Sequence, residues 1–309
     1  MDRIIEVLRT VLPVFLTLMI GVLCRSRKLI SREGINAMKH VAVNITLPAV
    51  LLSAFATTRY TPMDIVIPLL MFLVCLAAWL LGRWAGKLLK LPSRFVPFLT
   101  TGFEAGMLGY ALFNMLYGSA RTAEFARVDL GQVLFVFTVY KVLLGRETGE
   151  GAELRDLLKQ MAASPIIIAI VAGVVLGATG LYRAMEPSGL SRVFDACTDF
   201  ISAPTACLIL IAIGYDLVFA DIPWAEAGKV VALRLVIMLV LRTAFVALLK
   251  LMWPDAALAQ AVNVMFILPP PFVLPVFADD ESQRTYVSSA LSVSTLAAIA
   301  GFAVLAAMG

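Results

Sequence analysis

Residues that usually carry catalysis or metal binding are scarce in this chain. Among its 309 residues there is one histidine and there are four cysteines. His40 lies where a predicted helix enters the membrane, and we interpret it as an interfacial anchor rather than a proton carrier. The cysteines lie within or at the ends of apolar runs and form no CxxC motif: Cys24, Cys75, Cys197 and Cys207. We therefore expect buried, small side chains instead of disulfides or metal ligands.

The chain also lacks a basic run and any polar stretch long enough to fold on its own. Its net charge is only +4, which gives no sign of a nucleic-acid partner. Hydrophobic residues make up 61% of the sequence, and the mean hydropathy is +0.93. This composition is typical of a multi-pass membrane protein, which we expect in the cell's inner (plasma) membrane.

Apolar segments of about 20 residues predict an all-α polytopic protein with ten membrane spans, which we number 1 to 10. The predicted spans cover residues 7–24, 36–56, 64–86, 96–117, 127–144, 163–181, 191–219, 228–252, 256–278 and 284–308. The mixed-charge segment 146–160 divides them into two groups of five.

Lysine and arginine in the short loops predict the orientation of the first half. The loops after spans 1, 3 and 5 contain most of these residues: Arg25, Arg27, Lys28, Arg32, Lys39, Arg83, Lys87, Lys90, Arg94, Arg146, Arg155 and Lys159. The loops after spans 2 and 4 contain Arg59, Arg121 and Arg127. Because basic loops face the cytoplasm, both termini are predicted to be extracytoplasmic.

Span 9 contains a proline cluster that a membrane helix cannot accommodate. Residues 267–275 read Ile-Leu-Pro-Pro-Pro-Phe-Val-Leu-Pro. Pro269, Pro270 and Pro271 have no N–H to donate, and each disfavours a helical turn before it. Since backbone groups in lipid must be satisfied internally, we expect the helix to break beside Leu268, next to protein or water. Broken helices at membrane depth are typical of binding sites in secondary transporters.

An internal repeat predicts a second break, in span 4. The sequence Leu-Leu-Lys-Leu ends both span 3, at 88–91, and span 8, at 248–251. Matching these ends lays residues 106–109 almost on 268–271. Because each half has an odd number of spans, the two halves must be inverted relative to each other, an arrangement found in secondary transporters with crossing, broken helices.

Three glycines mark the expected break in span 4. Gly102, Gly106 and Gly109 share one helical face, which fits either close helix packing or an unwound stretch. Opposite the proline break we favour unwinding. Crossing half-helices would direct the partial positive charge of their N-termini toward one point, which suits an anion.

Glu104 is the most informative polar side chain because it lies in mid-span, where a carboxylate in hydrocarbon is costly. It either carries a proton or binds a cation beside the substrate, or it caps free N–H groups of the broken helix, and these roles are compatible. Asn44 lies one turn before Pro48 and either satisfies the carbonyls that the proline frees or donates to a substrate. Asn263 lies one turn before the break in span 9 and is a candidate cavity residue.

Two arginines lie within span 8. We expect Arg234 and Arg242 to form interhelical ion pairs, with Asp216 or Asp129 as partners, because an intramembrane arginine is costly unless it faces a partner inside the protein. Arg242 is also a candidate for attracting an anion.

At several of these residues the chain resembles the auxin efflux carrier family, which includes plant PIN-like carriers and bacterial organic-anion carriers. The similarity covers nearly the whole length, and its most specific segment is 44–49, Asn-Ile-Thr-Leu-Pro-Ala. The other similar segments are the first helix and loop and the two crossover positions: 12–21, 27–30, 34–36, 102–110 and 269–275.

The resemblance implies a ten-helix inverted repeat in which each half contributes to a scaffold and to a mobile transport domain. The first half would be 1–160, with scaffold helices in 1–60 and transport helices in 61–160. The second half would be 161–309, with scaffold helices in 161–222 and transport helices in 223–309. The resemblance also implies movement of an organic carboxylate by an elevator motion, and a homodimer.

The chain differs from plant members of that family at the crossover. Those members have asparagine and proline at both breaks. This chain has Glu104 and no proline in span 4, and its Asn263 precedes the break in span 9. The central hydrophilic loop is also short. These differences favour proton coupling and disfavour auxin itself as the substrate.

Together these observations predict a secondary active transporter of small organic anions, auxin-like or dicarboxylate, without a cofactor or metal. The expected partners are the anion and membrane lipid, and Glu104 is expected to exchange the coupling proton. The expected substrate site comprises Asn44, Gly102, Glu104, Gly106, Gly109, Asn263, Leu268, Pro269, Pro270 and Pro271.

Three alternatives remain open at this point. A sodium-coupled symporter of the same fold would use Glu104 and freed carbonyls as sodium ligands. A channel would give much faster fluxes. An intramembrane aspartic protease is disfavoured because Asp195 and Asp199 share one face of span 7 and no GxGD motif is present; we favour an acidic entrance there over a paired-carboxylate cation site, and we expect no enzyme activity.

Overall fold

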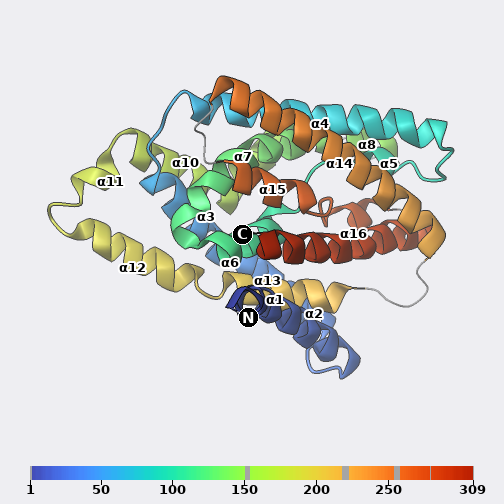
Figure 1. The fold of residues 1–309 in the computed structure, drawn as a ribbon, viewed down its shortest axis with the longest axis horizontal. Helices are drawn as coiled ribbons and strands as arrows, with labels where there is room; N and C mark the ends of the chain where they lie inside the picture. The colour runs from blue at the N-terminus through green and yellow to red at the C-terminus, as the bar shows by residue number, and fades with distance from the viewer. Residues whose placement is uncertain (1, 150–153, 218–222, 254–257, 279, 309) are drawn as a thin grey trace. The chain divides into compact units, whose positions relative to one another are not determined.

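The computed structural model describes residues 2–149, 154–217, 223–253, 258–278 and 280–308, and all regular secondary structure in these ranges is helical (Figure 1). The chain forms two compact units. The first unit comprises Met1–Ile65, Gly106–Arg127 and Lys159–Leu217. The second unit comprises Val66–Ala105, Val128–Leu158 and Val218–Gly309. Each unit therefore combines segments from both halves of the chain.

Seven helical stretches within the described residues are long and apolar enough to cross a membrane. They are Val7–Ser26, Arg32–Thr57, Met63–Leu88, Ser119–Thr148, Leu190–Asp216, Trp224–Met252 and Glu281–Met308. Each coincides with one of the predicted spans. The expected ends at residues 218–219 and 256–257 lie outside the described residues.

The three other predicted spans are not continuous helices of spanning length. Span 6 is α10 (Pro165–Ala178), with 14 residues. Span 4 is divided into α5 (Val96–Leu99), the π-helical segment η2 (Ala105–Gly109) and α6 (Tyr110–Tyr117). Span 9 is divided into α15 (Ala259–Ile267) and the 3₁₀ helix η5 (Leu274–Phe277). The structure thus establishes an all-helical architecture with seven candidate spans, while ten spans and the inverted repeat stay predictions.

The first unit is held together by close helix packing at glycines. It contains α1 (Asp2–Ser26), α2 (Arg32–Val41), the π-helical segment η1 (Ala42–Thr46), α3 (Leu47–Thr57), α6, η3 (Ser119–Arg121), α10, α11 (Leu181–Ala184), α12 (Leu190–Ser202) and α13 (Thr205–Asp216). α1 lies against α13, where a Cβ on Gly21 would lie 2.1 Å from the Ile211 carbonyl oxygen. α3 lies against α10, where a Cβ on Gly173 would lie 2.7 Å from the Phe55 Cβ. Small residues are needed at such contacts because membrane helices associate mainly through packing.

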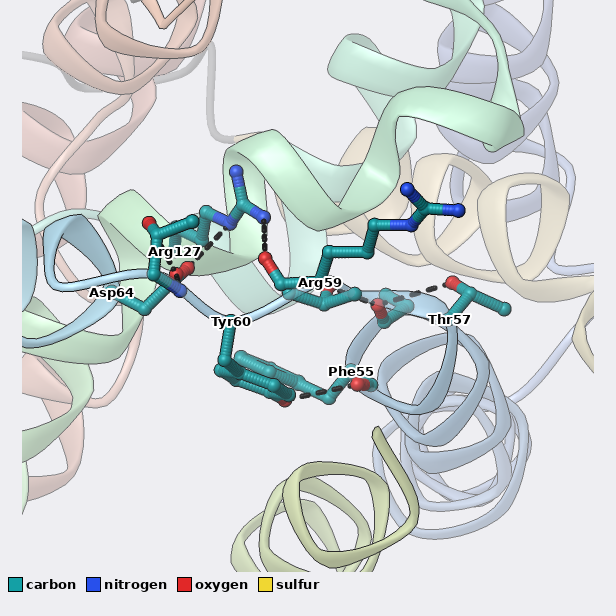
Figure 2. A network of polar contacts seen from close by, with 9 residues as sticks. Phe55, Thr57, Arg59, Tyr60, Asp64 and Arg127 are labelled. Carbon is teal, nitrogen blue, oxygen red and sulfur yellow. Dashed lines mark hydrogen bonds and ion pairs between the residues drawn. The ribbon is translucent and has the colours of Figure 1, made fainter. Parts of the chain in front are cut away.

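A polar network fixes the connection between α3 and α4 (Met63–Leu88) in the first unit (Figure 2). Arg127 Nε lies 2.6 Å from Asp64 Oδ1, and Arg127 Nη2 donates to the carbonyl of Arg59 at 3.2 Å. The hydroxyl of Tyr60 donates to the carbonyl of Phe55 at 2.9 Å. Burial, and then the nearby Asp64 carboxylate, raise the pKa of Tyr60 to about 12, so this hydroxyl remains a donor at physiological pH.

The second unit places the interrupted segments among its long helices. It contains most of α4, then α5, the π-helical segment η4 (Val136–Tyr140), α8 (Lys141–Thr148), α14 (Trp224–Met252), α15, η5 and α16 (Glu281–Met308). η2, α7 (Thr122–Phe135) and α9 (Leu154–Ala162) cross the unit boundaries. α14 and α16, orange and red in Figure 1, lie side by side. The end of α5 approaches α4 so closely that a Cβ on Gly82 would lie 3.3 Å from Pro97 Cα and 1.7 Å from Oγ1 of Thr100, the residue after α5.

The expectation that all four cysteines are buried is wrong for two of them. Cys24 and Cys75 are buried, whereas Cys197 on α12 and Cys207 on α13 are exposed. A membrane helix can present apolar side chains to lipid as readily as to its neighbours, so an apolar run does not predict burial. All four are free thiols.

Candidate functional site

The first interruption lies between α5 and η2 in the second unit. α5 ends at Leu99, and residues 100–104 are not helical. Gly102 has a φ of +67°, a left-handed conformation that glycine adopts more easily than other residues. The predicted break in span 4 is therefore present, but at 100–104. Gly106 and Gly109, expected to unwind, lie instead in the π-helical segment that leads into α6.

The second interruption follows α15 in the same unit. α15 ends at Ile267, and the next residue, Leu268, has an extended backbone with ψ of 149°. Residues 269–271 are buried and have no regular secondary structure before η5 begins at Leu274. The break that the three prolines predict is confirmed.

The two interruptions meet through Glu104. Its backbone N–H donates to the carbonyl of Pro269 at 2.9 Å. Its side-chain Oε2 accepts a hydrogen bond from the backbone N–H of Phe272 at 2.6 Å. A Cβ on Gly102 would lie 3.0 Å from Pro271 Cγ, so the two backbones approach closely there as well. The carboxylate of Glu104 thus caps an N–H group exposed by the proline break, and it is itself only partly buried.

Arg234 on α14 joins both interruptions from another side. Its side chain is buried, with 3% of the residue exposed. The guanidinium donates to four backbone carbonyls, at 3.1 Å to Leu99, 3.4 Å to Thr101, 2.7 Å to Gly102 and 2.9 Å to Leu268. It also lies 5.5 Å from the centroid of the Phe103 ring. Carbonyls that both broken segments leave without helical partners are therefore satisfied by one side chain.

The sequence did not predict this role for Arg234. We expected ion pairs for Arg234 and Arg242, but Asp216 pairs with Arg32 and Lys39 within the first unit. The position of Arg234 in the middle of an apolar helix indicates that it has polar partners inside the protein. The sequence does not show that these partners are backbone carbonyls, because that depends on where the interrupted segments lie in the fold.

Arg242 lies two turns after Arg234 on α14 and contacts Asn263 on α15. Its Nε and Nη2 donate to Oδ1 of Asn263 at 2.9 and 2.5 Å. Asn263 is thus held to α14 one turn before the proline break. Its amide oxygen is engaged by an arginine in the structure.

Asn44, Gly106 and Gly109 belong to the first unit, whereas the other residues of the expected site belong to the second. Asn44 lies in η1, and its Nδ2 donates to the carbonyl of His40 at 2.9 Å. The amide thus satisfies a carbonyl of its own helix, one turn earlier. The contacts described above join five of the other expected residues, directly or through Arg234: Gly102, Glu104, Leu268, Pro269 and Pro271. Asn263 contacts Arg242 instead, and Pro270 lies within the second interruption.

The first unit contains an acidic cavity of about 770 Å³. Asp195 and Asp199 on α12 line it together with Asn114, Thr122 and Tyr182. The Tyr182 hydroxyl lies 2.9 Å from both oxygens of Asp195 and donates to that carboxylate. Burial, followed by this hydrogen bond, raises the pKa of Tyr182 to about 12. Within the described residues, no group of three or more His, Cys, Asp or Glu side chains is placed to hold a metal ion.

Comparison with known proteins gives one informative similarity. No protein-family model matches the chain. An uncharacterised transporter of Methanocaldococcus jannaschii is 23% identical over 214 residues, which cover 67% of this chain and 68% of that protein. The chain is thus a multi-helix membrane protein that is similar to a transporter, with two interrupted segments joined by Glu104 and Arg234.

Proposed function

We propose that the protein is a secondary active transporter of small organic anions that binds its substrate at the two interrupted segments of the second unit. The observation that carries this proposal is the direct contact between the segments, in which Glu104 bonds to both Pro269 and Phe272. Irregular backbone at membrane depth is tolerated where it is buried in protein or lines a water-filled cavity, and in secondary transporters such broken helices form the substrate site. The similarity to a transporter supports the same class of function and disfavours an enzyme.

Glu104 is proposed to exchange the coupling proton. Its carboxylate accepts a hydrogen bond from Phe272 N–H and is partly exposed, so a proton can reach it. A charged acceptor makes a stronger hydrogen bond than a neutral one. Protonation would therefore weaken the contact that caps the proline break, and it would remove a negative charge beside an anionic substrate.

The wider mechanism is also a proposal. Ten spans in two inverted halves, an elevator motion of the transport helices against a scaffold, and a homodimer follow from the resemblance to auxin efflux carriers. The two interrupted spans and the short α10 account for the difference between ten predicted spans and seven continuous ones. Both termini are proposed to be extracytoplasmic.

Transport into proteoliposomes tests the proposed function. A thermal-shift screen with malonate, malate, other short carboxylates and indole-3-acetate first selects a substrate, because a ligand of the folded state raises Tm. Uptake of that substrate is then measured with and without an imposed pH gradient. We expect Glu104→Gln to remove the dependence on the gradient, since glutamine can accept from Phe272 N–H but cannot carry a proton.

Glu226→Gln is the matched control. It neutralises an exposed carboxylate at the start of α14 in the same unit, and uptake should keep its dependence on the pH gradient. Unchanged pH dependence in Glu104→Gln would refute the proton role. Failure of every carboxylate to bind or to be transported would refute the substrate class, and single-channel currents would identify a channel.

A further inference from the structure

We propose that Arg234 permanently fills a cation site formed by the carbonyls of the two interrupted segments, so that no sodium ion binds there. The conclusion that transport is independent of sodium rests on the function proposed above. The occupation of the site by the guanidinium of Arg234 does not rest on that function.

The carbonyls around Arg234 have the character of a cation site. Leu99 is the last residue of the one-turn helix α5, and Leu268 directly follows the last residue of α15, so two of the four oxygens lie where a helix stops and its last carbonyls have no helical partner. In transporters with broken helices, unwound carbonyls and half-helix C-termini are the groups that coordinate sodium ions. Here the same kind of donor set surrounds a guanidinium at 2.7 to 3.4 Å.

Backbone dipoles surround the charge of Arg234, because its guanidinium donates to the carbonyls of Leu99, Thr101, Gly102 and Leu268. These four carbonyls and the face of the Phe103 ring stabilise the cation. Arginine stays protonated under all physiological conditions, so the site remains occupied by a positive charge.

A second cation at this position would be repelled. A sodium ion would have to share the oxygens of Leu99, Gly102 and Leu268 with a guanidinium only a few ångströms away. Like charges at that distance in a buried site repel strongly. The two interrupted segments therefore contact both a fixed positive charge, Arg234, and the carboxylate of Glu104, and under the proposed function this leaves the proton as the coupling ion.

Two measurements on purified protein test the proposal without any transport assay. The first is binding of radioactive sodium to the wild-type protein, for which we expect no saturable component. The second is the melting temperature of Arg234→Ala, which we expect to fall by roughly 5 °C or more because four buried carbonyls lose their donor. Millimolar methylguanidinium should restore part of this loss, and sodium chloride should raise Tm more than N-methylglucamine chloride of equal concentration.

Controls separate the charge from the shape of the side chain. N-methylurea has nearly the same shape as methylguanidinium but no charge, and it should not restore Tm. Arg242→Ala removes an arginine from the same helix that binds Asn263, and methylguanidinium should not raise its Tm. If Arg234→Ala cannot be purified, the sodium-binding measurement on the wild type decides.

Three results would overturn the proposal. They are saturable sodium binding to the wild type, equal rescue of Arg234→Ala by N-methylurea, and a melting temperature of Arg234→Ala equal to that of the wild type. None of these depends on which substrate is carried. A transport failure would thus refute the proposed function and leave the occupied cation site intact.

Discussion

At the scale of single residues, the site depends on a backbone conformation that side chains disfavour. Gly102 has a φ of +67°, and a Cβ added there would lie 3.0 and 3.1 Å from two atoms of the Pro271 ring. The proline segment is held in place on its N-terminal side, because the carbonyl of Pro269 accepts from the backbone N–H of Glu104 and the carbonyl of Leu268 accepts from Arg234. Glycine is required at this position for both conformation and space.

We expect Gly102→Ala to destabilise the protein by about 2 kcal/mol or more, because a left-handed alanine costs about 1 kcal/mol or more and the contact with Pro271 adds to it. Gly106→Ala is the matched control. Its Cβ would meet Leu47 Cδ2 at an ordinary 3.5 Å, so it should be tolerated. Thermal unfolding followed by intrinsic fluorescence compares the two, and equal melting temperatures would contradict the argument.

At the scale of elements, the sequence predicted one interruption better than the other. Three consecutive prolines in span 9 forbid a helix whatever surrounds them, and the break is where they lie. Glycines only permit unwinding. In span 4 the chain therefore unwinds at 100–104, where α14 and the proline segment supply partners, and it remains helical at Gly106 and Gly109.

The ion pair between Asp64 and Arg127 provides a prediction at this scale, because it ties the α3–α4 connection to α7. The Asp64 side chain is 6% exposed, so removing Arg127 would leave a buried carboxylate without this partner. We expect Arg127→Ala and Asp64→Ala each to cost about 3 kcal/mol, and the double variant to cost clearly less than their sum. A double-mutant cycle in thermal unfolding measures this coupling.

Arg83 and Glu147 provide the comparison pair. They lie 3.9 Å apart with side chains 46% and 40% exposed, so their coupling should be below about 0.5 kcal/mol. Strict additivity at Asp64 and Arg127 would show that the pair contributes no more than this surface pair.

At the scale of the whole molecule, the chain combines both of its halves in each compact unit. Segments from residues 1–65 and 159–217 belong to the first unit, and the interrupted segments meet in the second. The resemblance to auxin efflux carriers implies that each half contributes helices to a scaffold and to a transport domain, and this division stays a prediction. The orientation of the whole chain in the membrane stays a prediction from its basic loops.

Cysteine labelling tests that orientation. On a background without the four native cysteines, Ser188→Cys should react with a membrane-impermeant maleimide in intact cells, because the loop between α11 and α12 is predicted to be extracytoplasmic. Ser26→Cys, at the end of α1 in a basic loop, should react only after permeabilisation. Both serines are exposed, so access and not burial decides the result. The reverse pattern would invert the predicted topology.

The sequence by itself determined where the seven long apolar helices of the described residues lie and that a helix must break at 269–271, because hydropathy and proline act locally. It also marked Glu104 as a residue that needs a partner, because a carboxylate in mid-span is costly wherever the chain folds. Only the tertiary structure decided what those partners are. Glu104 caps Phe272, and Arg234 gathers four carbonyls from two distant segments, because backbone groups freed by an interruption are satisfied by whatever residue packing brings within reach.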